Sequence, residues 1–288
     1  MRPFIHSILT YSTTFLISFT LLFAQLDFQS GQLLFNSADA KTISETHDHS
    51  EGTVLLNDNE ERISSLVQYF EQNGFDISHL LQDSRFEIYD GIGDRFRHSA
   101  ERRTLTLDEY KRILGFEDKK NRIAGFINEH HDQMVKAEET YGIPRYVIAA
   151  ILGIESDYGR NIGRFNPFNA YVSMYTEDYR SDFARAQLLE LMKFTERNGI
   201  DVLELKSSYA GAMSFAQFIP YSLNKWFVGD DIFDMNNNIQ SIGNYLAYFK
   251  EREGSIERAV FRYNPSQMYT DAVMALAQEA EALFADAR

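Results

Sequence analysis

One carboxylic acid in an otherwise apolar segment is the first candidate for chemistry. Residues 149–154 carry no polar side chain, Glu155 and Ser156 follow them, and the segment stops at Gly159. The residues seven, four and three positions before Glu155 share its face of a helix and are apolar: Ile148, Ile151 and Leu152. We therefore expect the carboxyl group to point inward, where burial disfavours ionisation and raises its pKa. Such a group can hold a proton near neutral pH and donate it to a leaving group.

A second segment with an unusual composition spans residues 208–220. Its small residues at 210–212 would let a neighbouring backbone or a ligand approach closely, because they carry little or no side chain. The amide of Gln217 offers a donor and an acceptor, and so does the hydroxyl of Ser208. Both side chains are therefore candidates for binding a polar ligand, or for a buried network and a helix cap.

A third segment, residues 259–269, contains a turn into the last predicted helix. The pair Asn264-Pro265 disfavours helical backbone, so the chain is predicted to turn there. The turn leaves Tyr263 and Asn264 at the mouth of the helix, where they are candidates for ligand contacts or for packing.

The order and spacing of these motifs resemble those of the lytic transglycosylases, most closely the membrane-bound lytic transglycosylase B family. The shared pattern is an acid followed by Ser, then Gly-Ala-Met with Gln-Phe-x-Pro, then Tyr-Asn-x-Ser-x-x-Tyr. Residues 141–144, Tyr-Gly-Ile-Pro, are similar to the Tyr-Gly-Val-Pro that precedes the acid in that family, and residues 242–249 resemble its late helix. The resemblance covers residues 120–275, with the core motifs in 141–275.

The resemblance implies a mostly α fold of the lysozyme-like α+β type, with a deep glycan cleft and a minor β or irregular insertion. It also implies cleavage of the β-1,4 bond between N-acetylmuramic acid and N-acetylglucosamine in peptidoglycan. Glu155 would be the sole acid and base. The resemblance places Arg180 near the peptide-bearing part of the substrate. The other expected substrate-binding residues are Ser156, Ser208, Gln217, Tyr248, Tyr263 and Asn264, most of them along the glycan cleft.

The implied reaction needs one carboxylate, whereas most glycosidases use two. Glu155 would protonate the glycosidic oxygen and then take the proton from the muramic 6-hydroxyl, which closes on C1 to give a 1,6-anhydro end. Asp157 is the nearest acid, but two positions along a helix it points to a different side. Two alternatives stay open: a hydrolytic muramidase that uses water as the nucleophile, and a wall-binding protein whose site has decayed.

Composition narrows the choice of partner. The chain has 288 residues, 44% of them hydrophobic, which suffices for one large or two small domains with a real core. Its 42 acidic residues outnumber 28 basic ones, and the formal net charge is −14. An acidic chain without a basic cluster is a poor candidate for nucleic-acid binding, because phosphate contacts dominate that affinity. There is no cysteine, so thiolate catalysis and thiolate metal sites are excluded. No feature of the sequence indicates an oligomeric state.

The N-terminus predicts export. Met1-Arg2-Pro3 carries a positive charge, and the apolar run that follows, residues 8–24, contains no charged residue. This layout is typical of a secretory signal peptide, and the run is at the short end for a membrane span. Residues 1–24 are therefore predicted to be a signal peptide or an uncleaved anchor with membrane association. Either one places the protein in the periplasm or cell envelope.

The remaining chain is predicted to be an arm followed by one helical domain. Residues 25–60 are mixed and polar, so we expect a linker or a poorly ordered arm, with the lysozyme-like domain at 61–288. Helical periodicity begins near Glu60, and a helix cap is predicted at Thr106. Pro144 is expected in the first turn of the Glu155 helix. A long helix is predicted to follow the Thr106 cap and to end near Gly142. Further helices are predicted at 181–197, 208–218, 237–252 and 267–286. An irregular or β insertion is expected around 83–105 or 160–180.

No cofactor and no metal are expected. Members of the resembled family can carry an EF-hand-like calcium loop after the second motif. Here that stretch is residues 228–236, which is short and lacks the alternating oxygen ligands of a calcium loop. The adjacent pair His130 and His131 lacks the spacing of four residues that a helical zinc site needs.

Overall fold

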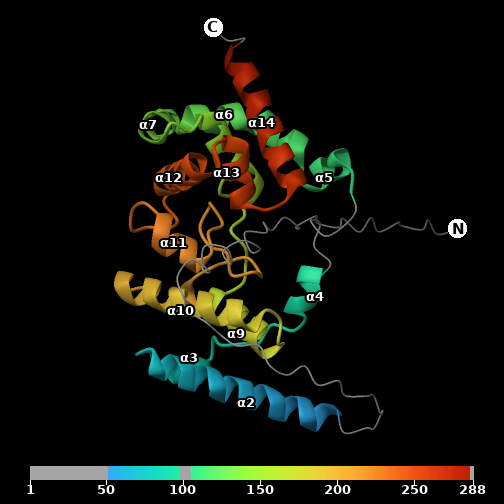
Figure 1. The fold of residues 1–288 in the computed structure, drawn as a ribbon, viewed down its shortest axis with the longest axis vertical. Helices are drawn as coiled ribbons and strands as arrows, with labels where there is room; N and C mark the ends of the chain where they lie inside the picture. The colour runs from blue at the N-terminus through green and yellow to red at the C-terminus, as the bar shows by residue number, and fades with distance from the viewer. Residues whose placement is uncertain (1–50, 98–104, 286–288) are drawn as a thin grey trace, which may run out of the picture.

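The computed structural model describes residues 51–97 and 105–285, and the regular structure of this part is almost entirely helical (Figure 1). The predicted signal peptide or anchor at 1–24, and the predicted arm up to residue 50, lie outside the described residues. Helix α2 begins at Glu51, earlier than the start near Glu60 that the periodicity predicted. Among the described helices, none is both long and apolar enough to cross a membrane.

The helices follow one another with short connections. The described helices, in chain order, are α2 (Glu51–Gln72), α3 (Ser78–Leu81), α4 (Ile92–Arg97), α5 (Leu107–Ile113), α6 (Phe116–Glu129), α7 (His131–Tyr141), α8 (Arg145–Ser156), α9 (Pro167–Thr176), α10 (Ser181–Asn198), the 3-10 turn η2 (Val202–Glu204), α11 (Pro220–Trp226), α12 (Met235–Glu253), α13 (Ile256–Tyr263) and α14 (Gln267–Ala285).

Helix α8 lies in the core of the molecule. Every residue from Val147 to Ser156 is buried, because the sequence supplies no polar face and the helix must therefore be covered on all sides. Helices α6 and α14 pack against it, and α7 and α12 also contact it. Pro144 is the N-cap of α8 and does not lie inside its first turn. This burial fixes the position of Glu155 at the C-terminal end of the helix.

The long helix expected from the Thr106 cap to Gly142 is three helices, and the first break comes between α5 and α6 at Gly115, which has φ 64°. Helix α6 ends at Glu129 and α7 begins at His131, because His130 leaves the helical region with φ −108° and ψ 26°. The apolar pattern continues across the break with a spacing of seven residues, from Ile127 to Met134, so the periodicity alone could not reveal it.

Other predicted helices are confirmed. The cap at Thr106 is a full capping box, in which Thr106 and Glu109 each accept a hydrogen bond from the other's backbone N–H. Helices α10, α12 and α14 match the predictions at 181–197, 237–252 and 267–286 within two residues. The short helices α4, α9, α11 and α13 were not among the predictions. Helix α9 occupies much of the 160–180 stretch that was expected to be irregular.

The helix predicted at 208–218 is wrong. Gly211, Ser214 and Gln217 have φ values of 76°, 69° and 52°, which a right-handed helix does not accommodate. The chain instead folds into successive turns held by isolated antiparallel bridges. The bridges join Phe165 to Ser207, Ser207 to Met213, and Met213 to Phe218. This small bridged region is β-like, but apart from Phe165 it lies outside 83–105 and 160–180, so the predicted location of the irregular or β insertion is wrong.

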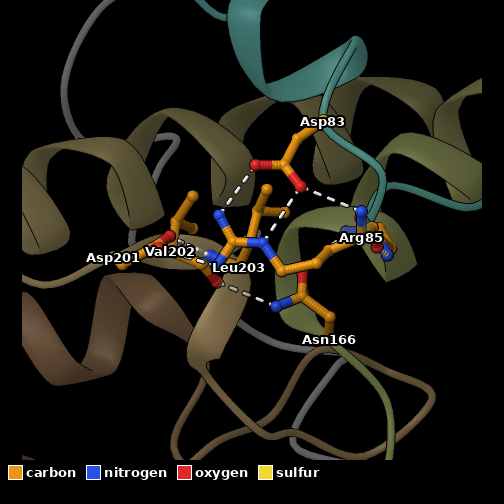
Figure 2. A network of polar contacts seen from close by, with 7 residues as sticks. Asp83, Arg85, Asn166, Asp201, Val202 and Leu203 are labelled. Atoms are coloured by element: carbon orange, nitrogen blue, oxygen red, sulfur yellow. Dashed lines mark hydrogen bonds and ion pairs between the residues drawn. The ribbon is translucent and has the colours of Figure 1, made fainter.

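Helices α2, α9 and α10 lie at the end of the molecule away from α6 and α14 (Figure 1). Helix α9 packs on α10 and against α2. Residues 83–96, which we call the strap, run along α9. Figure 2 shows the start of the strap, where the Arg85 guanidinium bridges two carboxylates. It donates to Asp83 at 2.8 Å and to Asp201 at 2.7 Å, and so joins the strap to the segment that precedes the bridged region.

Candidate active site

Glu155 is buried at the end of α8, with 3% of its surface exposed. Its carboxyl group accepts a hydrogen bond from the hydroxyl of Tyr269, with 2.6 Å between Oη and Oε1. Tyr269 comes from the first turn of α14 and is itself 1% exposed. The inward direction that the apolar neighbours of Glu155 predicted is confirmed. Tyr269 ended the third motif but was not predicted to be a site residue, so the sequence reasoning missed it.

Tyr263 links the third motif to the second. Its hydroxyl donates to the carbonyl oxygen of Ala216 across 2.5 Å, and Ala216 directly precedes Gln217. Burial, and then the negative charge of Glu155, raises the pKa of both Tyr263 and Tyr269 well above the usual value. Both hydroxyls therefore stay protonated, and the Tyr269 hydroxyl donates to the carboxyl group while the Tyr263 hydroxyl donates to the Ala216 carbonyl.

Asn264 follows Tyr263 and presents an unsatisfied amide. Only 1% of its surface is exposed, and neither Nδ2 nor Oδ1 has a hydrogen-bond partner among the described residues. Leaving buried donors and acceptors unpaired costs about 1–3 kcal/mol for each group, so such groups are uncommon without a role. A ligand that offers both an acceptor and a donor, as an N-acetyl sugar does, would satisfy this side chain.

Ser208 and Gln217 lie in the bridged region and are both buried. The Ser208 hydroxyl accepts from the backbone N–H of Ala212 at 3.2 Å, and the Gln217 amide donates to the Ser214 carbonyl at 3.0 Å. Each side chain therefore holds a turn of its own segment. Their contacts with a glycan stay predictions.

The small residues at 210–212 admit a protein side chain. The Tyr171 hydroxyl donates to the Gly211 carbonyl at 3.1 Å. A Cβ atom at Gly211 would lie 2.3 Å from the Tyr171 ring, which no alanine could tolerate. The close approach that this composition predicted is thus made by α9, which carries Tyr171.

The two residues after Glu155 end the helix. The Ser156 hydroxyl donates to the Leu152 carbonyl at 3.2 Å and accepts from the Gly159 N–H at 3.1 Å. Asp157 turns into the left-handed region with φ 55°, so its carboxylate leaves the direction of α8. It forms ion pairs there with Arg122 and, at 3.3 Å, with Lys119.

The ion pairs keep Asp157 charged. Burial would raise the pKa of Asp157, but the hydrogen bond from Arg122 and the charges of Lys119 and Arg122 outweigh it and hold the pKa below its usual value. Burial lowers the pKa of Lys119, and Asp157 opposes that shift. A carboxylate held in this way is a poor candidate for a second acid or base.

Arg180 and Tyr248, the two remaining predicted residues, are placed by other elements. Arg180 is the N-cap of α10 with φ 52°, and its guanidinium lies 4.3 Å from the centre of the Phe183 ring. Tyr248 lies on α12 against the indole of Trp226, under the Arg252 guanidinium at 4.2 Å. Both roles in substrate binding stay predictions.

Residues 228–236, which lack the ligand pattern of a calcium loop, lead into α12. Asp234 is the N-cap of that helix and accepts from the N–H of Asn237, while Asp231 accepts from the N–H of Phe233. Both carboxylates line a cavity of about 710 Å³ whose other walls include Tyr158, Arg160 and Phe215. In the described part of the chain, no three acidic or histidine side chains gather closely enough to hold a metal ion.

Calcium removal is therefore expected to have little effect. We predict that EDTA leaves the melting temperature of the protein unchanged, because Asp231 and Asp234 already stabilise backbone N–H groups. Thermal unfolding with EDTA, compared with added CaCl₂, measures this. A substantial fall in the melting temperature with EDTA would contradict the prediction.

Tyr269→Phe is expected to impair the site without unfolding the protein. A hydrogen bond to a charged group contributes about 1.5–3 kcal/mol, so we expect kcat/KM on glycan strands to fall about ten- to a hundredfold. Tyr245→Phe is the matched control, because the Tyr245 hydroxyl donates to the backbone of Arg262 at 2.8 Å. Steady-state kinetics that show equal losses for the two variants would argue against a role at Glu155.

Comparison with known proteins relates most of the chain to one family. The family model described as "Transglycosylase SLT domain" matches residues 58–256. Membrane-bound lytic murein transglycosylase B of Escherichia coli (strain K12) is 30% identical over 129 residues. That alignment covers 43% of this chain and 36% of the relative, so it spans about a third of the curated protein's length.

Solved structures share the fold. Soluble lytic transglycosylase SltB1 from Pseudomonas aeruginosa is 24% identical with a TM-score of 0.69, covering 78% of this chain and 99% of that one. SltB3 from the same organism, in complex with NAG-anhNAM-pentapeptide, is 19% identical with a TM-score of 0.68, covering 77% and 79%. Lytic transglycosylase SLT35 from Escherichia coli, in complex with calcium, is 20% identical with a TM-score of 0.67, covering 78% and 93%.

Proposed function

Because the chain belongs to the transglycosylase SLT domain family, we propose that it is an exported peptidoglycan lytic transglycosylase with Glu155 as its single acid and base. One observation carries this proposal above the others. A buried carboxylic acid accepts a hydrogen bond from the Tyr269 hydroxyl, and Asn264, five positions before that tyrosine, carries a buried amide that has no partner of its own among the described residues. That arrangement suits proton transfer beside a bound polar ligand.

The other acids near Glu155 in the sequence are engaged elsewhere. Asp157 forms ion pairs with Lys119 and Arg122, as described above. The Glu177 carboxylate accepts the backbone N–H groups of Ile92 and Gly93, and Asp178 and Asp182 pair with arginines. This supports a reaction that needs one carboxylate, because a two-carboxylate glycosidase requires a second acid flanking the bond.

In the proposed mechanism Glu155 works twice. It first donates its proton to the oxygen of the β-1,4 bond between N-acetylmuramic acid and N-acetylglucosamine, so that the bond breaks with a neutral leaving group. The resulting carboxylate then accepts the proton of the muramic 6-hydroxyl, whose oxygen bonds to C1. No water is consumed, Glu155 regains its proton, and the product carries a 1,6-anhydro end.

Tyr263, Tyr269 and Asn264 have distinct parts in this scheme. The Tyr269 hydroxyl orients the Glu155 carboxyl group and stabilises it when it is charged. Tyr263 holds the turn at Ala216, and so the neighbouring Gln217. Asn264 would bind an N-acetyl group of the glycan. SltB3, which has a similar fold, was solved in complex with NAG-anhNAM-pentapeptide, and this supports a substrate of the same class for the present chain.

The products decide between the proposal and its alternatives. The protein is incubated with purified peptidoglycan, and the released muropeptides are weighed by mass spectrometry. We expect 1,6-anhydromuramic ends, which are lighter by one water than reducing ends. Reducing ends would instead indicate a hydrolytic muramidase, and the absence of release would indicate a non-catalytic wall-binding protein.

A further inference from the structure

The strap is attached along the whole of α9. The backbone N–H of Tyr89 donates to the Ser173 hydroxyl at 2.8 Å, and the Tyr89 hydroxyl accepts the N–H of Asn166 at 3.0 Å. Further along, both oxygens of Glu177 accept the first backbone N–H groups of α4. With the Arg85 bridge at its start (Figure 2), the strap is fixed at both ends.

Phe96, at the end of the strap, lies between two segments of the candidate site. It is fully buried. Its ring stacks on Tyr179 with 5.1 Å between centroids, and meets Tyr209 edge to face at 4.9 Å. Tyr179 directly precedes Arg180 and Tyr209 directly follows Ser208, so one side chain separates the segments of two predicted substrate-binding residues.

The bridged region needs such support because it has little regular structure of its own. Residues 207–213 are held by isolated bridges and by turn hydrogen bonds such as that from the Ser208 N–H to the Ala212 carbonyl at 2.9 Å. A sheet would hold each strand on both sides, and this region lacks one among the described residues. The packing of Phe96 against Tyr209 must therefore help to fix the position of this region.

We propose that Phe96 is a positioning residue for glycan binding, which sets the separation between the Tyr179–Arg180 and Ser208–Tyr209 segments. This inference rests on the proposed function. It makes the strap part of the binding apparatus, although none of its residues belongs to the predicted cleft. Glu155 is held separately, since α8 packs chiefly on α6 and α14.

The test separates binding from chemistry. In Phe96→Ala we expect KM for soluble glycan strands to rise about tenfold, because small misplacements of binding groups are costly, while kcat stays within about twofold. Phe96→Leu keeps an apolar side chain between the two tyrosines and is expected to restore most of the loss in KM. An unchanged KM in Phe96→Ala would overturn the proposal.

Phe70→Ala is the matched control. Phe70 is also a fully buried phenylalanine in an edge-to-face pair, with Tyr69 at 5.5 Å, but it lies on α2. We expect this variant to lose stability without any rise in KM. An equal rise in KM in both variants would show that Phe96 acts through general stability only.

A measurement without substrate keeps the inference distinct from the proposed function. Hydrogen exchange at the amides of Ser208 and Met213 is expected to quicken in Phe96→Ala and not in Phe70→Ala. If the wild-type protein releases no muropeptides, the proposed function fails, and this exchange result still decides whether Phe96 positions the bridged region. Unchanged exchange in Phe96→Ala would refute that positioning.

Discussion

Glu155→Gln is expected to lower kcat on peptidoglycan at least a thousandfold while leaving the fold intact. Glutamine has the same shape as glutamic acid but cannot donate the proton to the glycosidic oxygen or take it from the 6-hydroxyl. General acid–base catalysis alone contributes about 10²–10⁴-fold, and here one residue would perform both transfers. The rate of anhydromuropeptide release, together with thermal unfolding, measures the effect. Near-normal release by this variant would refute the assignment of Glu155.

Asp157→Asn is the control that separates one-carboxylate from two-carboxylate chemistry. Asp157 is the nearest acid in the sequence, and its pairing with Lys119 and Arg122 predicts a loss of stability without loss of the reaction. We therefore expect anhydro products from this variant at rates much closer to those of the wild type. A collapse of activity equal to that of Glu155→Gln would favour a second catalytic carboxylate.

Gly163→Ala is expected to destabilise the protein strongly. A Cβ atom at residue 163, where φ is 87°, would lie 2.1 Å from the carbonyl oxygen of Ser207. The oxygen is a backbone atom and the backbone also fixes the position of the Cβ atom, so the clash can be relieved only by separating the paired segments around Phe165 and Ser207. We expect the free energy of unfolding to fall by about 3 kcal/mol or more, the range of severe single substitutions. Denaturant unfolding measures it.

Gly199→Ala isolates the cost of backbone strain from the cost of the clash. Gly199 also has a positive φ, 63°, but a Cβ atom there meets nothing within 4 Å. An alanine in the left-handed region costs about 1–2 kcal/mol, so this variant should be only mildly destabilised. A loss equal to that of Gly163→Ala would mean that strain, and not contact with Ser207, decides the effect.

The sequence predicted α8 and the burial of Glu155 well, because both depend on neighbours within two helical turns. A helix with apolar residues on every side has to lie in the core, and its acid has to lie there too. The capping box at Thr106 and the positions of α10, α12 and α14 follow from equally local signals. The family resemblance then predicted that Tyr263 and Asn264 lie at the same site.

The contacts that complete the site could not be predicted from local pattern. Glu155 and Tyr269 are 114 positions apart, and no periodicity links a residue of α8 to one of α14. The Ala-Gly-Ala stretch at 210–212 was predicted to be helical because its composition is compatible with a helix. Tertiary packing on Tyr171 and the positive φ of Gly211 overrode that preference. Phe96 likewise gave no signal, since one aromatic residue among many reveals no partner.

The bond between Tyr269 and Glu155 also bears on the order in which the protein is made. The ribosome delivers α8 first and α14 more than a hundred residues later, so a nascent chain carries the acid without the hydroxyl that holds it. The same is true of Tyr263 and Asn264, which come just before α14. The chain thus acquires its complete site only late in synthesis, when the segments needed to fold α8 into a core are also at hand.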